Sequence, residues 1–340
     1  MNSRGDVSDD EPLVHGGNLA TARHLFPGAP EPFIDLSTGI NPHSYPLPAF
    51  SADIFTRLPE PAGVRQLADI AARAYGAPSG TCVVPAPGTQ ILLAQVAGLV
   101  PAGRAAILGP TYAEHLRSAK VAGHEAAEVA SLDRLERANL AVVVNPNNPD
   151  GRLIPRAQLL ALAEQLSGHD GLLVVDEAFM DAAPGDASLA GDVDRENIVV
   201  LRSFGKFYGL AGVRLGFALA APDTATRLDA MLGPWAVSGP ALAIGQAALP
   251  DDAWRRNMRT RLDADTARLD RLFANAGLEV IGGTSLFRLA RCSDAAALFA
   301  QLGEAGIFVR RFDKHPSWLR WGLPASDAAW QRVAAALSSS

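Results

Sequence analysis

Short apolar runs alternate with stretches of helical periodicity between about residues 80 and 220, and this alternation limits the folds open to the chain. The apolar runs predict strands over 81–84, 105–108, 141–144, 172–175, 198–201 and 215–219, and the helical patterns between them cover 89–99, 113–122 and 156–166. Several runs are apolar throughout, as is typical of strands with helices on both faces. We therefore expect an α/β fold, with a large domain built on a mostly parallel mixed sheet and helices on both faces. The last two runs lack a helix-length link, so one of them is expected to run antiparallel.

The chain after residue 222 has a different pattern, which predicts a smaller α+β domain. Its expected elements are a long charged amphipathic helix over 251–276, a strand over 286–289, a helix over 294–305, a strand over 307–310 and a closing helix from Ser326. Residues 1–14 are predicted to be disordered. Residues 15–60 are predicted to form an arm, because they hold too few periodic segments for a domain. The large domain then spans 61–250, and the small domain spans 251–340 together with part of the arm.

Charge and composition argue against several classes of function. The 340-residue chain has a formal net charge of −6 and no run of basic residues, which disfavours a nucleic-acid surface. It has no apolar stretch long enough to span a membrane, and its N-terminus is polar and acidic rather than a secretory signal. Cys82 and Cys292 form no cluster with each other or with histidine, so no metal site is expected. We expect a cytoplasmic protein that binds neither nucleic acid nor a membrane.

Only three of the 30 basic residues are lysines, and Lys206 follows the predicted strand 198–201. Ser203 lies three residues before this lysine, and Arg214 lies eight residues after it. An amine in this setting can form a Schiff base with an aldehyde cofactor, while the hydroxyl and the guanidinium bind a phosphate on the same cofactor. The alternative is a surface lysine in a loop, as most lysines are.

Four further features stand at the ends of predicted strands, where open α/β sheets bind their ligands. Gly88 and Thr89 open a helix with free N–H groups and a hydroxyl, which suit an anion or an ordinary helix cap. Tyr112 can place an aromatic face over a planar ring, or it can simply pack. Asn148 lies in a sharp turn with two Asn-Pro steps. Asp176 ends an apolar strand, where a buried carboxylate needs a cationic partner such as a protonated pyridine, unless it only caps the next segment.

Taken together and in this order, these features resemble the fold-type I enzymes that use pyridoxal 5′-phosphate. Within them, the chain is similar to the aminotransferase-like group that includes histidinol-phosphate aminotransferase. The resemblance implies that Lys206 bonds the cofactor aldehyde and that Asp176 pairs with the pyridine nitrogen. It also implies that Asn148 contacts the ring hydroxyl oxygen and that Tyr112 lies on the ring face. The residues implied around the cofactor phosphate are Gly88, Thr89, Ser203 and Arg214.

Two C-terminal arginines resemble the anion-binding arginines of the same group. Arg310 ends the sequence Gly-Ile-Phe-Val-Arg, and Arg320 ends the sequence Trp-Leu-Arg. The planar guanidinium of Arg320 suits a forked contact with a substrate carboxylate, and the resemblance implies this role. Arg310 is the candidate for a second anionic group on the substrate.

The N-terminal arm is similar to that of the threonine-phosphate decarboxylases of cobalamin biosynthesis. The matching sequences are His15-Gly-Gly-Asn18 and Asp35-Leu-Ser-Thr-Gly39-Ile-Asn41-Pro. The resemblance implies that a homodimer decarboxylates L-threonine O-3-phosphate to (R)-1-amino-2-propanol O-2-phosphate. The candidate substrate contacts, beside Arg310 and Arg320, are then His15, Asn18, Gly39 and Asn41. By spacing alone His15 can equally be a surface or capping histidine, although its glycine neighbours permit close approach to an anion.

Three residues depart from the pattern of the aminotransferase-like group. Phe179 stands where relatives have a tyrosine that donates to the ring oxygen, and because phenylalanine cannot donate, a more basic Schiff base is expected. Gly205 stands where many relatives have a second hydroxyl residue, so one phosphate contact is expected to be missing. Leu58 stands where relatives have a tyrosine that reaches the partner subunit's cofactor, so that particular cross-subunit contact is not expected.

Three other functions are alternatives at this point. An aminotransferase of the histidinol-phosphate type would need a keto acid as acceptor and would release no carbon dioxide. A transcription regulator with this fold would carry an N-terminal DNA-binding domain, but only fourteen residues precede His15 here. An inactive interaction module is disfavoured because the lysine, aspartate and arginine set is intact.

Overall fold

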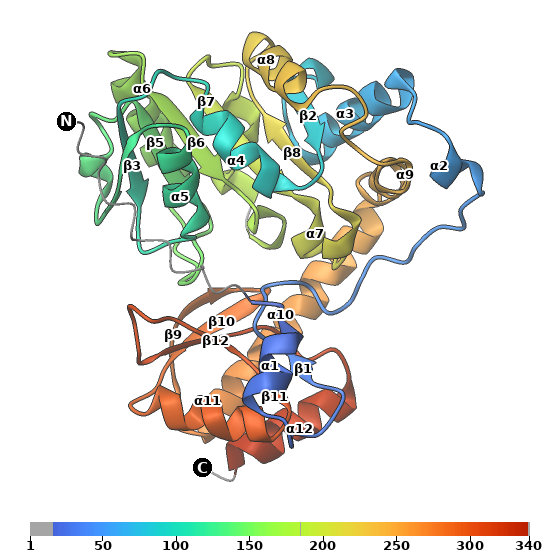
Figure 1. Cartoon of the computed structure of the whole chain (residues 1–340), viewed down its shortest axis with the longest axis vertical. Coiled ribbons are helices and arrows are strands. Elements are labelled where there is room, and N and C mark those ends of the chain that lie inside the picture. The colour runs from blue at the N-terminus through green and yellow to red at the C-terminus, as the bar shows by residue number, and fades with distance from the viewer. Residues whose placement is uncertain (1–15, 184, 339–340) are drawn as a thin grey trace, which may run out of the picture.

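The computed structural model describes residues 16–183 and 185–338, and it has two lobes joined by one long helix (Figure 1). The upper lobe in this view contains a seven-stranded sheet, and the lower lobe contains a four-stranded sheet. Helix α10 (Asp252–Asn275) runs from one lobe into the other. This confirms the long helix expected over 251–276, whose N-cap Asp251 accepts a hydrogen bond from the amide of Trp254. The architecture is the predicted α/β domain with a smaller α+β domain.

The seven-stranded sheet has the order β2-β8-β7-β6-β5-β3-β4. Its strands are β2 (Val83–Ala86), β3 (Arg104–Leu108), β4 (Glu125–Val129), β5 (Leu140–Val144), β6 (Leu172–Asp176), β7 (Ile198–Ser203) and β8 (Gly216–Leu219). Strand β8 runs antiparallel to both of its neighbours, and all the other pairs are parallel. The mixed, mostly parallel sheet is therefore confirmed, and so is the antiparallel partner expected for the last two strands.

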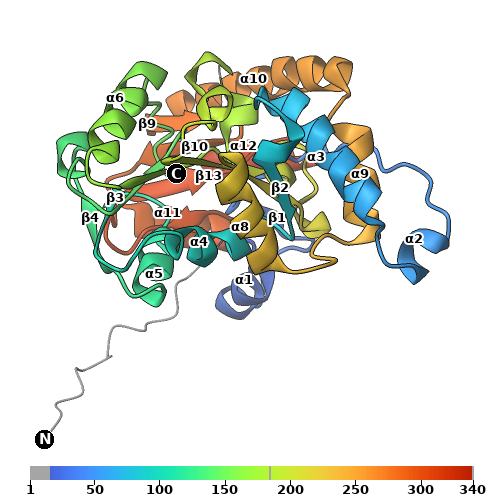
Figure 2. The ribbon, with the colours of Figure 1, turned by 90° about the horizontal axis from the view of Figure 1, so that it is seen from above.

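Helices cover both faces of this sheet, and successive residues of its central strands belong to two separate cores. On β6, Val174 packs into one core and Val175 into the other, and both side chains are buried. The helices of the core around Val174 are α4 (Thr89–Ala97), α5 (Glu114–Val121) and α8 (Pro222–Leu232). Those of the opposite core are α3 (Pro61–Tyr75), α6 (Arg156–Ser167) and α9 (Gly239–Ala248). Figure 2 shows α4, α5 and α8 on the side of the strands opposite α6. Because the central strands are covered on both faces, their residues are apolar throughout.

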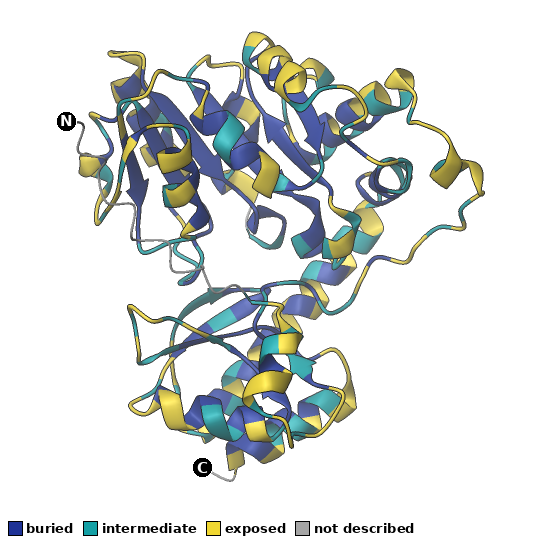
Figure 3. Cartoon of the chain, viewed as in Figure 1, coloured by how far each residue is buried: buried dark blue, intermediate teal, exposed yellow. Residues whose placement is uncertain are grey.

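The edges of the sheet differ from the sequence expectation. Strand β4 was not among the expected strands because its sequence, Glu-Ala-Ala-Glu-Val, lacks an apolar run. As the edge strand it is only partly covered, so it needs no such run. Strand β2 begins two residues later than expected, since Gly80–Cys82 form a 3-10 turn before it. In Figure 3 the central strands are buried, whereas the outer faces of the surrounding helices are exposed.

The small domain contains an antiparallel sheet of order β12-β13-β10-β9. Its elements after α10 are β9 (Glu279–Thr284), β10 (Phe287–Arg291), α11 (Ala295–Glu304), β12 (Arg310–Arg311), β13 (Trp318–Trp321) and α12 (Asp327–Ser338). The strand expected over 307–310 is in fact two: β11 (Ile307–Phe308) pairs elsewhere, and only β12 joins this sheet. Strands β9 and β13 were not expected, because two glycines weaken one pattern and a central arginine interrupts the other.

The N-terminal arm contacts both lobes. Helix α1 (Leu19–Leu25) and strand β1 (Ile34–Asp35) lie on the small domain, where β1 pairs in parallel with β11. The chain then runs along the outside of the large domain through α2 (Asp53–Thr56), as the blue trace in Figure 1 shows. Among the described residues, no helix combines the length and the apolar content of a membrane span.

Candidate active site

Lys206 and Asp176 stand at the ends of two neighbouring parallel strands. Asp176 is the last residue of β6, and Lys206 lies in the one-turn helix α7 (Phe204–Phe207) directly after β7. Burial lowers the pKa of the Lys206 amine to about 8, and the nearby guanidinium of Arg320 adds to this effect. Asp176 opposes the shift, whereas Arg214 favours it. Lys206, Asp176, Arg214 and Arg320 are therefore electrostatic neighbours.

The carboxylate of Asp176 is buried and has two polar partners. Its Oδ1 accepts from the amide of Ala178 at 3.0 Å, and its Oδ2 accepts from Nε2 of His115 at 2.8 Å. His115 is itself buried on α5, and its ring meets that of Tyr112 edge to face. The sequence interpretation did not include His115. His115 lies three residues after Tyr112 at the start of a predicted helix, and this spacing could have indicated that the two side chains lie on the same side.

The residues predicted around a phosphate lie together at the start of α4. Gly88 has a left-handed φ of 86°, and a Cβ there would lie 2.6 Å from Nη2 of Arg214. A Cβ on Gly216 would lie 2.7 Å from the amide nitrogen of Thr89, and Gly216 is the cross-strand partner of Ser203. This close approach brings helix N–H groups, two hydroxyls and a guanidinium to one place, which suits an oxyanion.

Gly205 is explained by packing. A Cβ at this position would lie 2.7 Å from Cα of Ala211 in the loop that follows the lysine. A hydroxyl side chain therefore has no room here unless the lysine turn moves away from that loop.

Tyr112 is fixed by a short chain of polar contacts. Its hydroxyl donates to Oε1 of Gln90 at 3.0 Å, and Nε2 of Gln90 donates to Oε2 of the buried Glu114 at 3.1 Å. Burial raises the pKa of Tyr112 to about 12, with smaller contributions from Glu114 and Asp176. The ring is thus a neutral phenol, held in one orientation next to the Asp176 carboxylate.

Arg320 is a buried cation with an unused donor. Its Nη1 donates to Oδ1 of Asn148 at 2.5 Å, and its Nη2 donates to the carbonyl of Ser37 at 2.7 Å. Its Nε is buried and has no hydrogen-bond partner among the described residues. Burial lowers the pKa of Arg320 to about 10, and Arg310, its cross-strand partner, contributes to the shift. No carboxylate hydrogen bonds to this guanidinium within the described chain, so it is suited to an anionic ligand.

Arg310 lies beside Arg320 and is half-buried. Burial lowers its pKa, whereas Asp313 and Tyr112 raise it. The contribution of Tyr112 indicates that Arg310 faces the same site from the small domain. The two arginines are cross-strand partners and lie side by side.

The arm residues occupy three different environments. Asn41 is buried: its backbone amide donates to the carbonyl of Lys206 at 2.9 Å, and its side-chain amide donates to the carbonyl of Phe207 at 2.7 Å. Its Oδ1 accepts from the amide of His43 at 2.8 Å. Asn41 thus supports the turn that contains the lysine, and direct contact with a substrate remains a prediction.

Gly39 packs between two aromatic rings, since a Cβ there would lie 2.9 Å from Phe287 and 3.0 Å from Phe179. Asn18 is exposed and caps α1 by accepting from the amide of Thr21. Its Oδ1 therefore has a structural role at this position, and contact of its side-chain amide nitrogen with a substrate remains a prediction. His15 lies outside the described residues.

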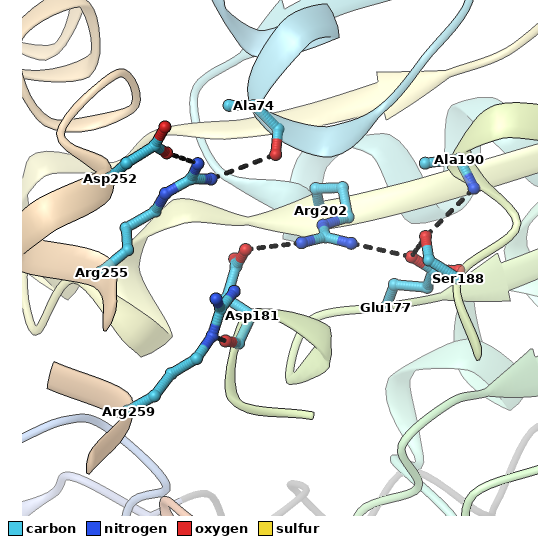
Figure 4. A network of polar contacts seen from close by, with 9 residues as sticks. All are labelled: Ala74, Glu177, Asp181, Ser188, Ala190, Arg202, Asp252, Arg255 and Arg259. Carbon is cyan, nitrogen blue, oxygen red and sulfur yellow. Dashed lines mark hydrogen bonds and ion pairs between the residues drawn. The ribbon is translucent and has the colours of Figure 1, made fainter. Parts of the chain in front are cut away.

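Residues that follow Asp176 and precede Lys206 in the sequence form a buried ion-pair network (Figure 4). Arg202 donates to Oε2 of Glu177 at 2.9 Å and to Oδ1 of Asp181 at 2.6 Å, and all three side chains are buried. Burial raises the pKa of Glu177, although Arg202 opposes the change. The carbonyl of Asp181 also accepts from Nε of Arg259 on α10 at 2.8 Å. The network connects the segment after Asp176, the segment before Lys206 and the helix between the lobes.

The arrangement fits pyridoxal 5′-phosphate. It offers a partly buried amine of lowered pKa for the aldehyde, a buried carboxylate for a protonated ring nitrogen, and a helix start with an arginine for the phosphate. These are the three groups that such a cofactor requires from its protein.

Comparison with known proteins agrees with this fit. The model of the aminotransferase class I and II family matches residues 51–337. The threonine-phosphate decarboxylase of Sinorhizobium sp. is 44% identical over 333 residues, covering 96% of this chain and 98% of that protein. The threonine-phosphate decarboxylase of Pseudomonas aeruginosa is 42% identical over 328 residues, covering 96% and 97%. The histidinol-phosphate aminotransferase of Sinorhizobium meliloti, solved in complex with pyridoxal-5'-phosphate, has a TM-score of 0.79 at 24% identity, with 100% of this chain and 97% of that chain covered. The chain therefore belongs to the aminotransferase class I and II family, and it is a fold-type I enzyme that uses pyridoxal 5′-phosphate.

Proposed function

We propose that this enzyme decarboxylates L-threonine O-3-phosphate to (R)-1-amino-2-propanol O-2-phosphate, as a step of cobalamin biosynthesis. Two relatives at 44% and 42% identity over nearly the whole chain are threonine-phosphate decarboxylases, which supports this substrate. The observation in the structure that carries the proposal is the paired Arg310 and Arg320 beside Lys206. A substrate with one carboxylate and one phosphate supplies an anion for each of them.

The large domain holds the cofactor in this proposal. Lys206 would bond its aldehyde, Asp176 would pair with the ring nitrogen, Tyr112 would lie on the ring face and Asn148 would contact the ring hydroxyl oxygen. Gly88, Thr89, Ser203 and Arg214 would hold the phosphate. When bound, pyridoxal 5′-phosphate supplies an electron sink for the bond that breaks at the substrate Cα.

The chain's own residues decide what happens at Cα. Lys206 has a pKa of about 8, so as a free amine beside the bound substrate it would be able to take up or return a proton near neutral pH. Arg320 binds the substrate carboxylate, and Arg310 binds its phosphate together with His15 and Asn18 of the arm. Gly39 and Asn41 complete the wall on the arm side. By holding the substrate carboxylate and phosphate in fixed positions, these contacts would decide whether Cα loses its carboxylate or its hydrogen, and in this proposal they select the carboxylate.

We further propose that the enzyme is a cytoplasmic homodimer. Several large apolar side chains of the arm and of the loop before α9 are exposed in the single chain: Leu47, Phe55, Leu58 and Trp235. Helix α2, which contains Phe55, lies against the start of α9, and exposed apolar side chains that gather on one region are typical of a protein interface. Analytical ultracentrifugation tests the dimer, and a monomer at micromolar concentration would contradict it.

The test of the proposed activity is carbon dioxide release from O-phosphothreonine in the absence of any keto acid. The decarboxylase releases it without an acceptor, whereas an aminotransferase of the histidinol-phosphate type requires one. A relative with that aminotransferase name is 30% identical over 329 residues, so histidinol phosphate with a keto acid is the second arm of the assay. Turnover only in that second arm would replace the proposed function with transamination.

A further inference from the structure

One transverse row of residues crosses the four-stranded sheet of the small domain. Gly282 on β9 pairs with Leu289 on β10, Leu289 pairs with Arg320 on β13, and Arg320 pairs with Arg310 on β12. Directly opposed residues of antiparallel strands project from the same face of the sheet. Both anion-binding arginines and the missing side chain of Gly282 therefore face the same way, toward the large domain that Arg320 contacts.

At Gly282 the backbones of the two domains touch. A Cβ on Gly282 would lie 2.1 Å from the carbonyl oxygen of Asp150, and its three nearest atoms all belong to Asp150. That same carbonyl accepts from the amide of Gly283 at 2.8 Å. From the opposite side, a Cβ on Gly151 would lie 1.9 Å from the carbonyl oxygen of Gly283. The contact thus depends on the absence of side chains on both partners.

The large-domain partner of this contact is the turn that contains Asn148. The carboxylate of Asp150 fixes this turn, since its Oδ1 accepts from Nδ2 of Asn147 at 2.7 Å and from the amide of Arg152 at 3.0 Å. Asn148 meets Nη1 of Arg320 in the same turn. How closely β9 approaches Asp150 therefore determines how closely Arg320 approaches Asn148.

We propose that Gly282 is a positioning residue. Because it has no side chain, the row that contains Arg320 and Arg310 can lie close to the turn that contains Asn148, and Gly282 thereby sets the distance between them. The inference rests on the proposed function in one respect, that these arginines bind the anionic groups of the substrate. A methyl group at Gly282 moves the row outward, because the carbonyl of Asp150 belongs to a fixed turn. The backbone of Gly282 is not left-handed, so alanine introduces this clash without conformational strain.

The experiment compares Gly282→Ala with Gly28→Ala, because Gly28 has no atom within 4 Å of its Cβ position and serves as the matched control. For Gly282→Ala we expect the KM for O-phosphothreonine to rise roughly 10- to 100-fold, as when a hydrogen bond to a charged group is lost. Cofactor content and affinity should match the wild type, since the proposed cofactor residues belong to the large domain. A variant with unchanged KM would overturn the proposal, and so would one whose only changes are a lower Tm and less bound cofactor.

A crystal structure of Gly282→Ala separates this proposal from the proposed function. The positioning role requires that the contact between Arg320 Nη1 and Asn148 Oδ1 be lost, and an intact contact overturns it even if the wild type releases no carbon dioxide. A wild type that fails to act on O-phosphothreonine overturns only the proposed function. If Gly282→Ala does not fold, Gly151→Ala changes the same contact from the other domain. Because its φ of 72° adds backbone strain within the Asn148 turn, the crystallographic distance between Arg320 Nη1 and Asn148 Oδ1 decides there, and KM does not.

Discussion

Nε2 of His115 lies 2.8 Å from Oδ2 of Asp176, and the two side chains are exposed to solvent by only 3% and 8% of their surface. The bond joins helix α5 to the end of strand β6. Within the described part of the chain, the other carboxylate oxygen accepts only from the amide of Ala178. His115 thus supplies the side-chain donor that orients Asp176, and a carboxylate at this depth needs such a donor.

Replacing His115 by leucine should weaken cofactor binding. The change leaves one oxygen of the Asp176 carboxylate buried without a donor, and loss of a hydrogen bond to a charged group corresponds to roughly a 10- to 100-fold change. Absorbance titration of the apoenzyme with pyridoxal 5′-phosphate measures the effect. The control is His115→Gln, whose Nε2 can donate from a similar position and should restore part of the affinity. Equal affinity in His115→Leu and the wild type would show that the histidine does not support Asp176.

Replacing Lys206 by alanine should abolish turnover and the absorbance band of the lysine-bound cofactor. The reason is that the amine is the group proposed to bond the aldehyde. The matched controls are Lys120→Ala and Lys314→Ala, since both lysines are exposed. They should behave as the wild type in the same spectrum and assay. A band that survives in Lys206→Ala but disappears in one of the controls would identify a different anchoring lysine.

The pH dependence of cofactor loading should report the pKa of Lys206. Only the neutral amine can attack an aldehyde, and burial together with Arg320 lowers this pKa from the ordinary 10.5 to about 8. The rate of reconstitution of the apoenzyme should therefore rise with pH and level off above about 8, whereas an ordinary lysine would still be gaining rate near pH 10. Replacing Arg320 by methionine removes a repelling cation, so the midpoint should move to higher pH. A midpoint that moves down, or not at all, would contradict the electrostatic link.

The sequence predicted the central sheet and the residues that end its strands, because both depend on local patterns. Apolar strands with polar residues at their ends or within four residues after them indicated Asp176, Asn148 and Lys206. His115 could not be inferred in this way, since its role depends on the distance between α5 and β6 rather than on spacing along the chain. The same holds for the row through Gly282, whose contact with Asp150 joins residues of two domains.

The substitution Phe179→Tyr should lower the pH at which the bound cofactor's absorbance titrates. Phe179 is buried, and its ring centroid lies 5.8 Å from Nζ of Lys206. The aminotransferase-like group has at this position a tyrosine that donates to the ring oxygen, and Phe179→Tyr restores that donor. Spectroscopic pH titration measures the midpoint. The control is Phe287→Tyr on the neighbouring ring, 5.1 Å away and next to Arg320 rather than Lys206. If both variants shift the midpoint equally, the effect is not specific to the ring beside the lysine.

Removing Arg202 should destabilise the fold strongly. Its guanidinium lies between Glu177 and Asp181, with side-chain exposures of 5%, 0% and 3%, so Arg202→Met leaves two carboxylates buried without their cation. Breaking a buried pair in this way lowers the free energy of unfolding by about 3–5 kcal/mol. Urea denaturation followed by circular dichroism measures this change. The matched control is Arg134→Met, whose pair with Asp133 is exposed by 72% and 67% and should matter by no more than about 0.5 kcal/mol. Similar losses in both variants would mean that the network behind the active site adds no more than a surface pair does.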